Sequence, residues 1–210
     1  MTPENKVHYN HESVVRLKGE KVDLCTFRTD TDAVHLYTRW INNEDINMWI
    51  HQNIHVHPYE DEYAIVTKMA NDGNFHFNIV CRETGMMIGN CALKRSPFNA
   101  HEIAIGIFIG DEDNCGKGYG REAVKLMLKM AFEDLGIRTV TLTAHGDNAR
   151  AIRCYTACGF KEFGRCKEIL WAKDHWADRV YMSIQANDYF MNRKDKSNNE
   201  KHCTAEGQPG

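Results

Sequence analysis

The spacing of apolar residues along this chain changes from helical to alternating and then to a strand–helix–strand order. Residues 21–28 alternate polar and apolar side chains and predict a half-buried first strand. Apolar residues then recur at intervals of three and four, which predicts helices over residues 34–41, 45–50 and 59–70. The N-terminal third is therefore expected to be mainly helical.

Alternation returns in the middle of the chain. Residues 75–81, 86–95 and 102–109 predict a meander of three strands. An amphipathic helix over residues 121–135 and a β-branched strand over residues 139–144 follow. A strand, a helix and a strand at this spacing normally form two parallel neighbours with a right-handed crossover.

The remaining segments complete one α/β domain. A shorter helix over residues 148–158 precedes a closing hairpin, with strands at 160–171 and 179–185 and a turn region at 172–178. No internal repeat or second core is visible. The predicted organisation is a polar N-terminal arm over residues 1–20, one domain over residues 21–191, and a disordered tail over residues 192–210.

Composition and charge narrow the class of protein. The chain has 210 residues, with 26 Lys and Arg against 29 Asp and Glu, a net charge of −3. It lacks the basic surplus that nucleic-acid binders usually carry. No run approaches the roughly 18–20 apolar residues of a membrane span. The polar start does not resemble a secretory signal. The eight cysteines include no CxxC pair, so free thiols and a cytoplasmic location are expected.

The clearest chemical signal is a glycine-rich loop between a strand and a helix. Gly116, Gly118 and Gly120 let the backbone approach a ligand, and the start of the helix favours an anion such as phosphate. The nucleoside-triphosphate loop does not match, because its spacing and its Ser or Thr are missing. The dinucleotide fingerprint does not match either, because Arg121 occupies its last glycine position.

A second block places an amide and a phenol on one helix. Asn148 and Tyr155 are seven positions apart, which puts them on the same helical face about 10 Å apart along the axis. That arrangement suits a long, partly polar ligand. Asn148 is also a natural N-cap, and this role is compatible with binding.

These two blocks resemble the GNAT acetyltransferases. The family's acyl-CoA loop, Gln/Arg-x-x-Gly-x-Gly/Ala, matches residues 115–120, and its Asn-x-x-Ala-x-x-x-Tyr…Gly-Phe block matches residues 148–160. The resemblance extends over residues 21–186 and is similar to the ribosomal-protein N-terminal and spermidine acetyltransferase branch, partly through residues 40–43. It implies an α/β fold: a mixed, mostly antiparallel sheet of six to seven strands, helices on both faces, and splayed parallel central strands.

The resemblance also implies a function and a set of site residues. It implies direct transfer of acetyl from acetyl-CoA to a primary amine, which could be a protein N-terminus, a polyamine or another small molecule. Tyr155 would act as the acid that reprotonates CoA, and Trp40, Glu44 and Asp45 would shape the acceptor pocket. Residues expected to hold acetyl-CoA are Ile107, Phe108, Ile109, Cys115, Gly116, Lys117, Gly118, Tyr119, Gly120, Arg121, Asn148 and Tyr155. Cys115 departs from the family pattern, which has Gln or Arg at that position.

Several assignments stay open at this stage. Thr143, Glu102, Glu112 and His145 are all candidates for the base, and a water chain with no single base is the alternative. The acceptor could also be an antibiotic or an aminosugar, and a non-catalytic CoA-binding regulatory module is the alternative of another class. A homodimer is the candidate assembly of this chain. No metal is predicted, although three imidazoles lie close together at His51, His55 and His57.

Overall fold

The computed structural model describes residues 14–50, 56–172 and 175–193. They form one eight-stranded sheet in the order β1-β2-β3-β4-β5-β6-β8-β7. Its strands are β1 (Val15–Lys18), β2 (Val22–Thr26), β3 (Phe75–Cys81), β4 (Met87–Arg95), β5 (Glu102–Ile109), β6 (Thr139–His145), β7 (Lys161–Ala172) and β8 (His175–Gln185). The helices are α1 (Thr31–Ile41), α2 (Glu44–Asn47), α3 (Tyr59–Ala70), α4 (Tyr119–Lys129) and α5 (Ala149–Ala157).

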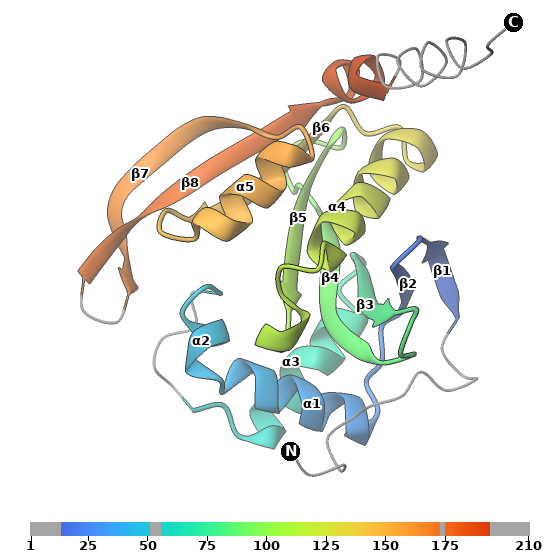
Figure 1. Cartoon of the computed structure of the whole chain (residues 1–210), viewed down its shortest axis with the longest axis vertical. Helices are drawn as coiled ribbons and strands as arrows, with labels where there is room; N and C mark the ends of the chain where they lie inside the picture. Colours follow the sequence, from blue (N-terminus) through green and yellow to red (C-terminus); the bar gives the residue numbers. More distant parts are fainter. Residues whose placement is uncertain (1–13, 51–55, 173–174, 194–210) are drawn as a thin grey trace, which may run out of the picture.

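Helices cover both faces of this sheet, as expected (Figure 1). On one face, α4 contributes Val124, Met127 and Leu128 to a large apolar cluster that includes side chains from six of the strands. On the other face, α1, α2 and α3 form a smaller cluster with Met87 of β4, and Phe108 of β5 packs against it. Strand side chains alternate between faces, so β4 and β5 supply residues to both cores.

The sheet is mostly antiparallel, and β5 and β6 form its one parallel pair in the described part of the chain. This pair is short. β5 has eight residues and β6 has seven, yet only Glu102–Ala104 pairs with residues 139–141. Beyond Ala104 the two strands separate, which confirms the predicted splay and opens the centre of the sheet.

Most predicted elements are confirmed, and four details needed correction. The sheet has eight strands rather than six to seven, because residues 15–18 of the expected polar arm form β1 against β2. α2 is shorter than predicted. α4 begins at Tyr119, because Gly118 adopts the left-handed conformation that ends the loop. The last hairpin is longer, with β8 starting at His175 where Trp176 pairs with Trp171.

The end of the chain partly departs from the expected tail. Residues 186–193 are helical, so order continues past the predicted boundary. The remaining residues of the predicted tail, 194–210, and residues 1–13 of the predicted arm lie outside the described residues.

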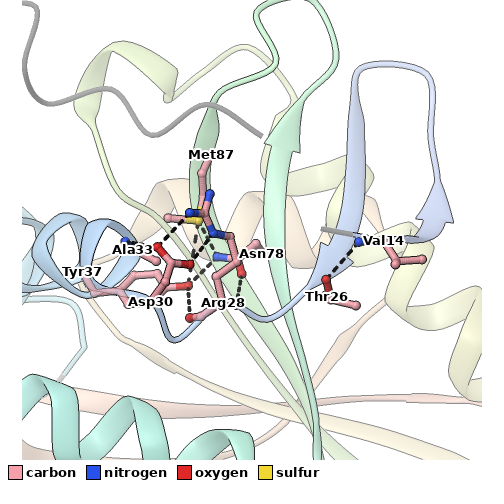
Figure 2. Close-up of polar contacts among 8 residues, drawn as sticks. All are labelled: Val14, Thr26, Arg28, Asp30, Ala33, Tyr37, Asn78 and Met87. Carbon is pink, nitrogen blue, oxygen red and sulfur yellow. Dashed lines mark hydrogen bonds and ion pairs between the residues drawn. The ribbon is translucent and has the colours of Figure 1, made fainter. Parts of the chain in front are cut away.

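A buried polar network attaches α1 to the sheet (Figure 2). Asn78 of β3, which is 1% exposed, accepts a hydrogen bond from the Arg28 N–H at 2.8 Å and donates to the Tyr37 hydroxyl. Asp30 caps α1 by accepting from the Ala33 N–H and also pairs with the Arg28 guanidinium at 2.6 Å. The network fixes the entry to α1, and α1 carries the following chain to the splayed end of β5.

One glycine controls the packing of α1 against β5. A Cβ added at Gly110 would overlap the indole ring of Trp40, which is 1% exposed. We therefore expect Gly110→Ala to lower the free energy of unfolding by about 1–3 kcal/mol, since the ring must shift in a packed core. Gly106→Ala, within β5, is the matched control, because its Cβ would meet nothing within 4 Å. Urea denaturation of both variants measures the difference, and equal stabilities would contradict the packing role.

Candidate active site

A cavity of about 860 Å³ follows the separation of β5 and β6. Its walls include Ile107 and Ile109 of β5 and Leu142 and Ala144 of β6, all of which pack in or against the larger core. They also include Phe108 and His145 from the opposite face of the same strands. One continuous cavity therefore reaches both faces of the sheet.

Backbone groups of β5 face this opening. The Glu102 carbonyl and the Gly110 N–H both bond toward β4. Because successive peptide groups of a strand point to opposite edges, the N–H groups of Ile107 and Ile109 point toward β6, where no strand pairs with them. Ile107 and Ile109 are among the residues that the sequence analysis expected to hold acetyl-CoA.

The glycine-rich loop forms one end of the cavity. Gly116 and Gly118 have φ values of +75° and +87°, which favour glycine, and both line the cavity with Gly120. Gly118 is the N-cap of α4 and offers no side-chain cap. The first N–H groups of the helix therefore have no intrahelical acceptor, and they are available to an anion.

The side chains of this loop have different placements. Arg121 lines the cavity, whereas Lys117 is exposed and is not among the lining residues. The Tyr119 ring is buried, and its hydroxyl accepts from the Cys81 thiol at 3.5 Å. Cys115 lines the cavity with its thiol directed at the Asp111 carbonyl, and burial raises the pKa of this thiol. Cys115 therefore stays protonated at neutral pH.

α5 supplies the second wall. Asn148 caps the helix by accepting from the Ala151 N–H at 2.9 Å, and it also lines the cavity. Tyr155, two helical turns further along α5, also lines the cavity and packs edge-on against Phe160. Burial, and then the neighbouring thiols of Cys154 and Cys158, raise the pKa of the Tyr155 hydroxyl above its usual value. This phenol holds its proton at neutral pH.

Cys154 of α5 also lines the cavity. A hydrogen bond with Cys158, one helical turn away, and the nearby charge of Arg121 lower the pKa of the Cys154 thiol to about 7. The Cys158 thiol itself is directed at the Arg121 carbonyl at 3.7 Å. The seven described cysteines are free thiols, as predicted.

The structure separates the three predicted acceptor residues. Asp45 lines the cavity. Trp40 packs in the core, with its ring centroid 5.8 Å from that of Phe108, and Glu44 is exposed and does not line the cavity. Sequence reasoning missed aromatic residues that line the same side, namely Trp49, Phe163 and Tyr181. Phe163 and Tyr181 meet only because β7 and β8 pair, so no local sequence signal marked them.

All four base candidates line the cavity, in different parts of it. Glu102 lies at the start of β5, where β5 and β6 are still paired. Glu112 lies in an exposed 3-10 turn, Glu112–Asn114, next to the glycine-rich loop. Thr143 and His145 lie along β6, and His145 is 1% exposed.

Two further expectations concern metal and membrane. No group of three or more metal-ligating side chains occurs among the residues that the structure describes. Of the three clustered histidines, His51 and His55 lie outside those residues. Within the described ranges, no helix is long and apolar enough to span a membrane.

Comparison with known proteins now decides the family. The acetyltransferase (GNAT) domain family matches residues 22–161, which is most of the chain. The chain belongs to the GNAT acetyltransferase family. The GNAT enzyme described here is therefore an acyl-CoA-dependent acyltransferase, and its splayed sheet is the family's fold.

Individual relatives of this GNAT protein are distant. It is 24% identical over 130 residues to the uncharacterized N-acetyltransferase p20 of Bacillus licheniformis, covering 61% of this chain and 72% of that protein. Spermidine N-acetyltransferase from Vibrio cholerae, solved with CoA and spermine, superposes with a TM-score of 0.72 at 19% identity, covering 82% and 99% of the two chains. Ribosomal-protein-S5-alanine acetyltransferase from Vibrio fischeri gives 0.65 at 19% identity, covering 82% and 97%.

The cap role of Asn148 can be separated from any role toward a ligand. We expect Asn148→Ala to lower the free energy of unfolding by about 1 kcal/mol, because the Ala151 N–H loses its acceptor. Asn148→Asp keeps a capping oxygen and should retain stability. Thermal and urea denaturation test this, and equal loss in both variants would contradict the cap assignment.

Proposed function

We propose that this GNAT enzyme transfers an acetyl group from acetyl-CoA to a primary amine. The observation that carries the proposal is the single cavity that crosses the sheet between β5 and β6, with an anion-binding loop at one end and acidic and aromatic residues on the other face. Two substrates can thus approach one point from opposite sides. Bound acetyl-CoA would supply an activated acetyl group as a thioester.

The residues on the α4 side fit a CoA molecule. Residues 116–120 present open backbone and the free N–H groups of a helix start, which suit a pyrophosphate. Arg121 adds positive charge from the cavity wall, Lys117 adds charge within the loop, and Cys115 precedes it. The N–H groups of Ile107 and Ile109 would bind the pantetheine arm and the thioester oxygen, with Phe108 between them.

Tyr155 is the proposed acid. Its side chain lines the cavity from α5, two helical turns after Asn148, and packs against the same core as α4. The raised pKa of this phenol keeps its proton available for the departing thiolate. In this proposal the amine attacks directly, so the half-buried Cys115 and the α5 thiol Cys154 form no acyl-enzyme.

The other face would receive the amine. Asp45 lines this side, and its carboxylate favours a cationic acceptor. We place Trp40 as a support for Phe108, and Glu44 as an outer charge rather than a contact. The spermine complex and the alanine acetyltransferase among the structural relatives make a polyamine and a protein N-terminus the first acceptors to try. Free thiols agree with a cytoplasmic enzyme, and a homodimer stays a prediction.

An acceptor panel tests the proposed function. Purified protein with acetyl-CoA is offered spermine, spermidine, a peptide starting with alanine, and an aminoglycoside, and thiol release and product mass are recorded. We expect acetylation of at least one amine with sequential kinetics. Acetyl-CoA binding without thiol release for any amine would instead support a CoA-binding module. Ping-pong kinetics or acetylated Cys154 or Cys115 would contradict direct transfer.

The glycine-rich loop can be tested by binding. We expect Gly118→Val to weaken acetyl-CoA binding by more than roughly tenfold in calorimetry, because a branched side chain at positive φ distorts the start of α4. Gly73→Val is the matched control, since Gly73 also has a positive φ, of +75°, and lies outside the cavity. Equal affinity in the two variants would remove the loop from the binding site.

The acid role of Tyr155 makes a kinetic prediction. We expect Tyr155→Phe to lower kcat by about 100-fold and to leave the acetyl-CoA dissociation constant nearly unchanged, because only proton donation is lost. Tyr63→Phe, at an exposed position on α3, is the control. An unchanged kcat would remove Tyr155 from this role.

A further inference from the structure

The orientation of His145 follows from the alternation of β6. Val140, Leu142 and Ala144 belong to the core under α4, so the odd-numbered side chains of the strand point to the opposite face. His145 accordingly contacts Trp49, with ring centroids 5.4 Å apart at an angle of 86°. His145 therefore lies on the side of the sheet opposite the glycine-rich loop and Tyr155.

The strand register fixes the height of His145 in the cavity. Glu102 pairs with Thr139 and Ala104 with Thr141. Carried along the two strands, the same offset sets His145 level with Phe108. Phe108 also points to the opposite face, where it packs against Trp40. His145 thus faces the β5 segment whose N–H groups open into the splay, at the height where the proposed thioester carbonyl would lie.

The turn after β6 holds this imidazole in place. The Gly146 N–H donates to the Asp178 carbonyl at 2.7 Å, and the Asn148 N–H donates to the His145 carbonyl at 3.0 Å. The Asp147 carboxylate lies 3.9 Å from the His145 Nδ1. A buried ring in a tight turn next to a carboxylate is a suitable support for proton transfer.

The charges around His145 set its protonation. Asp147 faces the His145 ring from the turn. His175, at the start of β8, contacts the Asp147 carboxylate at 2.7 Å, and Arg179 of β8 is the cross-strand neighbour of His145. Asp45 of α2 lines the same cavity. Burial lowers the pKa of the imidazole, Asp147 opposes this shift and His175 reinforces it. The ring is therefore neutral at neutral pH and can accept a proton.

The other candidate bases are less well placed. Glu102 is six residues before Phe108, about 20 Å along an extended strand. Glu112 lies next to the glycine-rich loop, on the side assigned to CoA. Thr143 carries a hydroxyl that does not hold an extra proton near neutral pH.

We propose, on the basis of the function proposed above, that His145 is the general base and that Asp147 is its positioning residue. The acceptor ammonium enters from the Trp49 side and gives one proton to an imidazole nitrogen. The resulting neutral amine uses its lone pair to attack the thioester carbonyl carbon. The tetrahedral adduct collapses by breaking the C–S bond, and Tyr155 protonates the departing thiolate from the other face. The new amide nitrogen then loses its second proton, which restores the Tyr155 hydroxyl through solvent, and the imidazolium returns its own proton to solvent.

The test is the pH dependence of His145→Asn, with the amine that the acceptor panel identifies. In the wild type, kcat/KM should fall below a pH set by the lowered His145 pKa and should be level between that pH and the pKa of the amine. In His145→Asn, kcat/KM at pH 7 should drop by about 100-fold. Its pH profile should rise continuously with the fraction of free amine. The acetyl-CoA dissociation constant should not change.

Controls distinguish the possible failures. His101→Asn, at an exposed position in the turn before β5, should behave as wild type. A His145→Asn enzyme that keeps its activity and its acidic limb overturns the base assignment alone. A wild type that acetylates no amine overturns the proposed function and this proposal together.

A second variant decides the case in which His145→Asn fails to fold. Asp147 is 46% exposed, so Asp147→Asn should fold. Removing its negative charge makes the imidazolium less stable, so the acidic limb should move to lower pH. The imidazole resonances of His145 in a histidine-labelled NMR titration should move with it. An acidic limb that stays in place, or a His145 pKa above 8, overturns the proposal.

Discussion

The early end of the β5–β6 ladder is the constraint on which this structure depends. If β5 and β6 paired along their full length, the facing peptide groups of both strands would be hydrogen-bonded and the sheet would be closed. Here pairing stops after Ala104, although both strands continue for several residues. The N–H groups of Ile107 and Ile109 have no partner strand in the part of the chain that the structure describes. A buried N–H group without a hydrogen-bond acceptor costs free energy. A ligand lying between the strands, as proposed above, would satisfy these N–H groups, so the opening and the proposed binding site would be one feature.

Two separate cores make the opening tolerable. The cluster under α4 and the cluster of α1, α2 and α3 hold opposite faces of the sheet, and the cluster under α4 includes side chains of both β5 and β6. Both clusters use side chains of β5, so the strand that borders the gap is fixed from both sides. The polar network around Asn78 and the close approach of Gly110 to Trp40 then fix how α1 reaches this strand.

The local pattern of apolar residues predicted the elements with regular spacing. It was least successful where pairing between distant segments decides whether a strand forms. The bounds of β3, β5 and α3 follow directly from alternation or helical spacing. β1 has four mostly exposed residues and becomes a strand only through pairing with β2, so its sequence carried little signal. The conformations of the glycine-rich loop and of Asn148 can be predicted from the local sequence. The aromatic wall does not, because Phe163 and Tyr181 come from a bulged hairpin.

The same sheet separates two groups that handle protons. Tyr155 and His145 border one cavity from opposite faces, and burial acts on them in opposite directions because it always opposes the charged form. It raises the pKa of the phenol, which keeps its proton, and it lowers the pKa of the imidazole, which loses one. A donor on one face and an acceptor on the other therefore follow from a single physical effect. A reaction that takes a proton from the attacking group and returns one to the leaving group needs that pair of states, and in the proposed complex the splayed strands would hold the reacting atoms between them.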